Sequence, residues 1–150
     1  MKKINLITTF LFLLVIIPST SRGQNFNTDQ IIGEWIFDYD ESLALMDPSA
    51  QQYFAQLDAN NLAKVQEAYQ NRKLSFEEGG IFIQEMTNGH SIKGNWSLEN
   101  GFLSISNSSG NTILFKVKRL NEALLLIPRK STNDRASMIF SQWYLNKIEE

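Results

Sequence analysis

The sequence predicts an all-β protein: an eight-stranded antiparallel up-and-down barrel with a helical insert between its first and second strands. Segments with a two-residue apolar alternation recur at spacings near ten residues from residue 73 onward, which is typical of antiparallel sandwiches and barrels. Short turn signals join most of these segments, so sequential hairpins are expected. Eight is also a strand count at which such a sheet can close and remove its edges. A two-sheet sandwich is the alternative, because strand count and turn spacing do not separate the two.

The first 23 residues have the pattern of a cleavable signal peptide. Two lysines precede an apolar stretch over residues 4–17 that ends at Pro18, as in secretory signals. Small residues at positions 21 and 23 fit cleavage before Gln24. A retained membrane anchor is the alternative, but the unbroken apolar run falls short of the roughly 20 residues needed to cross a bilayer. We therefore expect a secreted or periplasmic single domain over residues 24–150, with no membrane span after cleavage.

Composition and charge narrow the class of protein. The chain contains no cysteine, so neither a disulfide nor lipid attachment at a cysteine is available, and one core must hold the domain. Cleavage would remove three of the fourteen Lys and Arg residues and none of the sixteen Asp and Glu residues, which leaves a formal charge of −5. Nucleic-acid binding is disfavoured, because a phosphate-binding surface needs clustered Lys and Arg.

The first strand is predicted over residues 31–39. Its odd positions place Trp35, Phe37 and Tyr39 on one face, while acidic residues point away from that face, as in a half-buried strand. Residues 24–30 before it are polar and are expected to form a loose segment.

The helical insert is predicted over residues 47–72. Asp47 followed by Pro48 fits the start of a helix, and apolar residues then recur at spacings of three or four in two groups. The groups are separated by a jump of five residues around Asp58, so we expect two short helices with Asp58 capping the second. The apolar stripes would pack against one end of the barrel. A lid over a cavity is the alternative.

The other strands follow from alternation and turn chemistry. Asn88-Gly89 and Asn100-Gly101 are the strongest hairpin signals, because both central residues of a type I′ turn need positive φ. Gly79-Gly80 and Gly110-Asn111 mark further turns, and a polar loop is expected over residues 131–136. The strands are expected over residues 73–77, 81–87, 91–99, 102–106, 112–120, 123–127 and 138–146.

Catalytic and metal-binding patterns are weak in this sequence. The single histidine, His90, directly follows Asn88-Gly89, where an exposed turn histidine is a simpler interpretation than a member of a serine triad. Asp38-Tyr39-Asp40-Glu41 begins like a calcium loop but lacks the glycine and closing glutamate, so we interpret it as a capping cluster where strand meets helix. Gly79-Gly80 follows two glutamates and precedes no Lys-Ser, unlike a phosphate-binding loop. We expect no enzymatic activity, no metal site and no cofactor.

Aromatic residues dominate the positions predicted to point inward. Either these rings fill the barrel as a packed core, or some of them line a cup for an apolar ligand, and a barrel of eight strands is just wide enough for both outcomes. Phe76 and Phe140 belong to the same inward set. The candidate ligand-binding residues are Trp35, Phe37, Tyr39, Trp96, Phe115 and Tyr144.

Gly33-Glu34-Trp35, which opens the first strand, resembles the Gly-x-Trp of lipocalins, whose tryptophan closes the base of the barrel. Residues 74–82, followed by Gly94-Asn95-Trp96 and Leu103, are similar to small secreted lipocalin-like proteins common in Bacteroidota. The similarity spans most of residues 31–147. It implies binding of a small hydrophobic or amphipathic molecule. The alternative is an envelope or extracellular protein-interaction scaffold with a filled barrel and no small ligand.

The chain also departs from the lipocalin pattern. It has no match to the Thr-Asp-Tyr element, it cannot form the disulfide that many lipocalins carry, and its helical insert is foreign to the standard plan. Arg129 and Arg135 are the candidates for the basic residue that would cover the ring of Trp35. Ligand identity, protein partner and oligomeric state stay open at this level.

Overall fold

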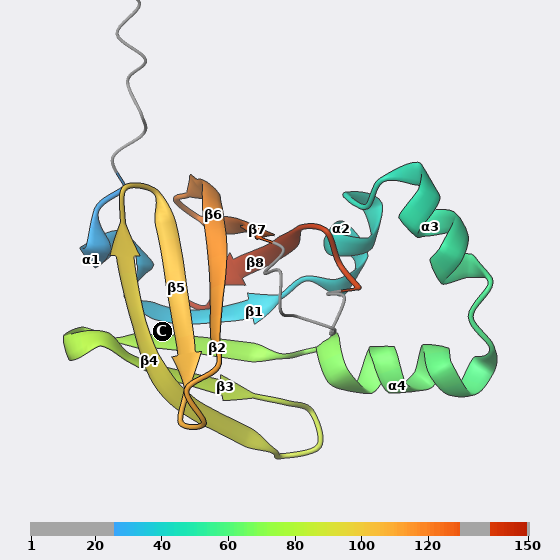
Figure 1. Cartoon of the computed structure of the whole chain (residues 1–150), viewed down its shortest axis with the longest axis horizontal. Helices are drawn as coiled ribbons and strands as arrows, with labels where there is room; N and C mark the ends of the chain where they lie inside the picture. The colour runs from blue at the N-terminus through green and yellow to red at the C-terminus, as the bar shows by residue number, and fades with distance from the viewer. Residues whose placement is uncertain (1–25, 130–138, 150) are drawn as a thin grey trace, which may run out of the picture.

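The computed structural model describes residues 26–129 and 139–149 (Figure 1). Within these residues eight strands form a closed barrel in which each strand pairs antiparallel with the next and the last pairs with the first. The predicted fold class is therefore confirmed, and the sandwich alternative is wrong. The expected signal peptide and the polar loop over residues 131–136 lie outside the described residues. The strands are β1 (Gly33–Phe37), β2 (Lys73–Glu77), β3 (Ile81–Glu85), β4 (Ser91–Glu99), β5 (Phe102–Asn107), β6 (Thr112–Leu120), β7 (Ala123–Pro128) and β8 (Trp143–Lys147).

Helices lie at both ends of β1. The short α1 (Thr28–Ile31) precedes it, and α2 (Tyr39–Ala44), α3 (Pro48–Ala55) and α4 (Ala59–Tyr69) follow it, on the opposite side of the barrel from α1 (Figure 1). A 3-10 turn, η1 (Glu78–Gly80), joins β2 to β3. The predicted helical insert is confirmed. The side chain of Asp58 caps α4 by accepting a hydrogen bond from the backbone N–H of Asn61 (2.9 Å).

The first strand is shorter than its alternation predicts. Ile31 ends α1 and Tyr39 begins α2, so Tyr39 lies at a helix start and not on the inner face of a strand. The side chain of Asp38 accepts a hydrogen bond from the backbone N–H of Glu41 (3.0 Å). The acidic cluster after the strand is therefore a helix cap, as predicted, because its carboxylate satisfies a free N–H of the first turn.

The last strand starts later than predicted, and its facing is reversed. β8 begins at Trp143, and Trp143 and Leu145 are buried whereas Tyr144 is half-buried on the other face, where it pairs with Leu125. The predicted inward orientation of Tyr144 is wrong. The alternation that predicts it counts through Phe140, which is buried as a loop residue and not as a strand position.

The base of the barrel, at the end where α1 lies, is closed around Trp35. The indole nitrogen of Trp35 donates a hydrogen bond to the carbonyl oxygen of Ile31 in α1 (2.8 Å), and both residues are fully buried. Lys147 Nζ lies 5.4 Å from the centre of the Trp35 ring. Arg129 instead covers Phe102, at 4.7 Å, and the other candidate, Arg135, lies outside the described residues. The cation over Trp35 is thus a lysine of β8.

The opposite end of the barrel, beneath α2–α4, is filled by an aromatic cluster. Its rings pack with centroids 4.9–6.4 Å apart, mostly edge to face or tilted, which is the favoured geometry for aromatic pairs. Members come from the strands, from the helices and from the segment before β8, so the helical stripes pack against the barrel end. The cluster consists of Phe37, Tyr39, Phe54, Tyr69, Phe140 and Trp143.

Arg72 lies beside this cluster and is only 7% exposed. Its Nε and Nη2 both donate hydrogen bonds to the carbonyl oxygen of Ala68 (2.9 and 2.6 Å), and its Cζ lies 4.1 Å from the centre of the Tyr69 ring and 5.3 Å from that of Trp143. Burial lowers the pKa of the Arg72 guanidinium and raises the pKa of Tyr69. The guanidinium therefore joins the end of α4 to the barrel. Its N–H groups bond the carbonyl of Ala68, and its planar face lies near the rings of Tyr69 and Trp143.

Candidate functional site

Most of the residues predicted to bind a ligand lie in the packed core. Trp35, Phe37 and Phe115 are at most 3% exposed, and Phe115 packs against Trp143 with ring centres 5.1 Å apart. These positions favour the interpretation in which the rings fill the barrel. Tyr39 and Tyr144 are half-buried outside the strand interior, as described above, so the structure does not bring the six predicted residues together in one cavity.

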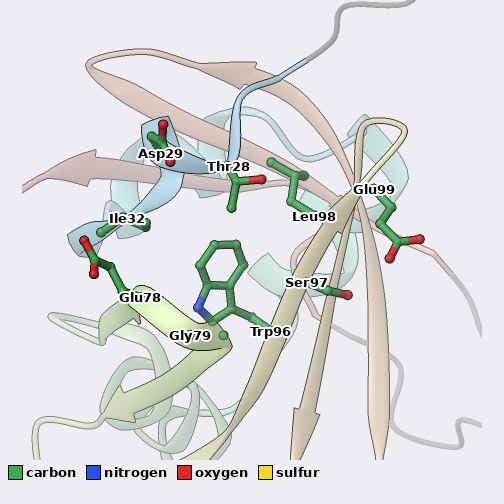
Figure 2. Close-up of a pocket in the computed structure, with 10 residues that line it drawn as sticks. Thr28, Asp29, Ile32, Glu78, Gly79, Trp96, Ser97, Leu98 and Glu99 are labelled. Carbon is green, nitrogen blue, oxygen red and sulfur yellow. The ribbon is translucent and has the colours of Figure 1, made fainter.

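One of the six, Trp96, does border a cleft. The cleft has a volume of about 390 Å³ and lies at the base of the barrel, between α1, η1 and β4 (Figure 2). We call it the basal cleft. Its lining residues are Thr28, Asp29, Ile32, Glu78, Gly79, Gly80, Trp96, Ser97, Leu98 and Glu99.

The basal cleft exists because β4 is longer than its neighbour β3. Pairing between the two strands ends at Ile81 and Asn95, whereas β4 continues to Glu99, paired on its other side with β5. The last four residues of β4 thus have no partner strand on the side of β3, and η1 and α1 border the space instead. A sheet edge of this kind leaves inward-facing side chains accessible from one side.

Apolar side chains form the floor of the basal cleft. Trp96 and Leu98 belong to the inward face of β4, and Ile32 comes from the link between α1 and β1. In Figure 2 the six-membered ring of Trp96 points from β4 toward Thr28 and Ile32. Trp96 is 7% exposed and packs edge to face on Phe76, with ring centres 5.5 Å apart. The floor is therefore rigid and mostly carbon.

The side of the cleft formed by η1 carries two glycines, which leave it without side chains at these positions. Gly79 and Gly80 have φ values of 75° and 80°, which residues with a Cβ seldom adopt. A Cβ at Gly80 would also lie 3.0 Å from the carbonyl oxygen of Trp96. The glycine pair lets η1 turn close to β4 without placing a side chain between them.

The rim of the basal cleft is polar and acidic. Asp29 lies on the side of α1 and Glu78 on the side of η1, while Ser97 and Glu99 project from β4 away from the Trp96 ring (Figure 2). None of the described residues that line the cleft is basic. In the part of the chain that the structure describes, no three His, Asp or Glu side chains are grouped so as to hold a metal ion. The arrangement suits contact with a small amphipathic molecule.

Sequence reasoning missed the contribution of α1 to the cleft. Thr28, Asp29 and Ile32 fall in or next to a segment expected to be loose. A signal was present: Asn27 and Gln30 form a capping box in which each side chain bonds the other residue's backbone N–H, the pattern that starts many helices. The apolar Ile31 and Ile32 that follow then pack against the barrel.

Described residues also line two other clefts. One, of about 400 Å³, lies between the start of β1, at Gly33-Glu34, and the end of β8 with the residues after it, 147–149. The other, of about 490 Å³, lies between α2 and α3, where Gln51 donates hydrogen bonds to three backbone carbonyls of the α2 end and the turn after it. Neither is lined by a buried aromatic residue of a strand, which distinguishes the basal cleft.

His90 is exposed in the turn between β3 and β4, as predicted, and its backbone N–H donates to the side chain of Asn88 (2.9 Å). Over residues 26–129 and 139–149, no helix has the length and apolarity to span a bilayer. Comparisons of the chain with protein-family models, curated proteins and solved structures found no match. The geometry of the basal cleft is therefore the basis on which a function can be assigned.

Proposed function

We propose that this protein is an exported, lipocalin-like binding protein that holds a small amphipathic molecule in the basal cleft. One observation carries the proposal: β4 continues past its pairing with β3, so the inward-facing Trp96 and Leu98 border an open cleft instead of another strand. The cleft volume of about 390 Å³ falls within the range of about 300–1,000 Å³ that is usual for small-molecule sites. Its carbon floor and polar rim fit a ligand with one apolar and one polar part.

The packed interior supports a site at the base over a site in the barrel lumen. A ligand in the lumen would have to displace fully buried rings such as Phe76 and Phe115. Exposing one large apolar side chain costs about 1.5–3 kcal/mol. This cost would cancel much of the free energy gained when a ligand binds in the lumen. The basal cleft requires no such displacement.

Sequence features support export and the lipocalin-like class. The apolar segment over residues 4–17 with its flanks has the signal-peptide pattern. Gly33-Glu34-Trp35 stands at the start of β1 with the indole of Trp35 bonded across the base, the position that the lipocalin tryptophan occupies. A closed meander of eight strands fits the same class.

The proposal is tested by titrating the purified protein with 1-octanol and, separately, with octylammonium chloride while NMR signals are followed. We expect the Trp96 indole N–H and the methyl groups of Ile32 and Leu98 to shift in a saturable manner with at least one of the two probes. Methyl groups of the buried core, such as Leu126, should stay unchanged. Absence of any saturable shift with both probes, or shifts confined to the core, would contradict the proposal.

A pair of matched variants locates the site. Thr28 is exposed on α1 and lines the cleft, so Thr28→Trp should fill the cleft and abolish the shifts of Ile32 and Leu98. Thr112 is also exposed but begins β6 and is not part of the cleft lining. Thr112→Trp should bind both probes as the parent does, and equal loss of binding in the two variants would contradict a site at the base.

The second candidate function is protein–protein interaction through the helical insert. The observation that favours it is Tyr53 on α3, which is 66% exposed although it is large and partly apolar, and aromatic residues are enriched in interfaces. A photo-crosslinking amino acid at position 53 in cells that produce the protein would capture such a partner. If no crosslinked species forms, only the ligand-binding proposal keeps support.

A further inference from the structure

We propose that the ligand of the basal cleft is an organic cation, of the alkylammonium or arylammonium class, which lies with its apolar part on the floor and its charge at the rim. This inference rests on the proposed function and goes beyond it by specifying that the ligand is positively charged. It is carried by the charged residues of the cleft lining, which are all acidic and lie beside an apolar floor.

The acidic groups at the rim are available to a ligand. Glu78 is exposed on η1 and lines the cleft, and no hydrogen bond or ion pair of its carboxylate occurs within the described residues. Asp29 is exposed on α1, and its Oδ2 accepts one long hydrogen bond from the side chain of Asn27 (3.3 Å). Both carboxylates therefore keep free acceptor capacity at the edge of the cleft.

The described residues that line the cleft bring no positive charge to this rim. The lining contains no Lys, Arg or His among the described residues. Lys147 lies over Trp35 and lines a different cleft. Arg129 lies over Phe102, the partner of Glu99 in β5, and is not part of the lining. Because like charges repel, a ligand carboxylate or phosphate at this rim would be disfavoured, whereas a ligand ammonium group would be attracted.

The charge is better matched by an organic cation than by a metal ion. Calcium requires six to eight oxygen ligands, and the described part of the chain contains no group of three potential ligating side chains close enough to hold an ion. The floor of Ile32, Trp96 and Leu98 offers carbon contacts, which a metal ion cannot use. Apolar contact combined with an unpaired acidic rim fits a cation that carries a hydrocarbon part.

The experiment compares three probes with the same eight-carbon chain: octylammonium, 1-octanol and octanoate. At pH 7 a primary alkylamine is protonated, as a Lys side chain is. Shifts of the Ile32 and Leu98 methyl groups give the Kd of each probe at low and high salt. We expect octylammonium to bind about fivefold more tightly than 1-octanol and octanoate to bind most weakly, with the differences reduced at high salt because exposed charges are screened.

Two double variants separate the local rim from the overall negative charge of the protein. Asp29→Asn with Glu78→Gln removes the rim carboxylates of α1 and η1 and leaves Glu99, which projects away from the Trp96 ring. Glu41→Gln with Glu85→Gln removes the same charge from exposed positions in α2 and at the far end of β3, outside the cleft lining. The rim variant should bind octylammonium and 1-octanol equally, and the control variant should keep the preference of the parent.

The outcomes distinguish the two proposals. If 1-octanol or octanoate binds the parent as tightly as octylammonium does, the inference about charge is overturned while the binding function stands. The same holds if both double variants lose the preference equally, since net charge alone then explains it. If none of the three probes binds, the proposed function itself is contradicted and the inference falls with it.

Discussion

The indole nitrogen of Trp96 in β4 donates a hydrogen bond to the carbonyl oxygen of Glu77 at the end of β2, at 3.0 Å. This bond passes over the end of β3, at the place where β3 and β4 are no longer paired. It fixes the plane of the ring that forms part of the basal cleft floor. The gap in the sheet that creates the cleft is thus bridged by a side chain of the cleft floor, so this part of the site is preorganised for a ligand.

The two buried indoles at opposite ends of the barrel should respond differently to replacement by phenylalanine. Trp35→Phe breaks the hydrogen bond to Ile31 and leaves a buried carbonyl without its donor, whereas Trp143 Nε1 is buried with no hydrogen-bond partner among the described residues. We expect Trp35→Phe to lower the free energy of unfolding by about 1–3 kcal/mol more than Trp143→Phe does. Urea unfolding monitored by circular dichroism measures both. Equal losses would show that the bond across the base adds no stability.

Gly94 in β4 should tolerate no side chain. A Cβ built on Gly94 would overlap the carbonyl oxygen of Ser106 in the neighbouring β5, so the two strands would have to separate. We expect Gly94→Ala to reduce the free energy of unfolding by about 1–3 kcal/mol. The exposed neighbour Asn95 provides the control, since Asn95→Ala changes no buried contact. Urea midpoints that coincide for the two variants would refute the close approach.

The planar guanidinium of Arg72 should be irreplaceable by an ammonium group. Lysine keeps the positive charge but cannot stack on Tyr69 and bond Ala68 with two nitrogens at once, so Arg72→Lys should cost about 1–3 kcal/mol of folding stability. Arg119→Lys, at an exposed position of β6, should change stability by less than about 0.5 kcal/mol. Thermal and urea unfolding of both variants would reveal the difference. Similar small effects would mean that Arg72 contributes only its charge.

Stability should fall at alkaline pH because of Tyr69. Burial is the larger influence and raises the pKa of Tyr69 above its ordinary value of 10.0, although Arg72 acts in the opposite direction. Between pH 10 and the raised pKa, the unfolded chain releases the phenolic proton while the folded protein keeps it. The stabilisation is therefore complete below pH 10 and decreases as the pH rises, by at most about 1.4 kcal/mol per pH unit. Tyr69→Phe should show a shallower decline from pH 9 to pH 11, and parallel declines would disprove this role.

The strands of the barrel could be predicted because their signals are local. The alternation of β4 and the Asn100-Gly101 turn, where both residues have positive φ in the structure, specify a strand and a hairpin without reference to the rest of the chain. The same reasoning was less accurate at Asn88-Gly89. Only Gly89 has positive φ there. The backbone N–H of Met86 donates to the carbonyl oxygen of His90, and the N–H of Gly89 donates to the carbonyl oxygen of Met86, so the turn begins at Met86 and β3 ends at Glu85.

The basal cleft could not be predicted in the same way, because it depends on tertiary register. Its existence requires that Ile81 pairs with Asn95 and not with a residue nearer the end of β4, and nothing in the local sequence specifies that offset. The alternation did place Trp96 on the inner face, where it lies. It could not say that this one ring borders a cleft while Trp35 and Phe115 are enclosed by other side chains.

The location of the ligand tests the central claim most directly. In a crystal structure of the protein with 8-bromooctylammonium, the anomalous signal of bromine marks the end of the hydrocarbon chain. We expect the bromine on the floor formed by Ile32, Trp96 and Leu98, with the ammonium group near Glu78 and Asp29. Bromine within the barrel beside Phe115, or between α2 and α3, would contradict binding at the base.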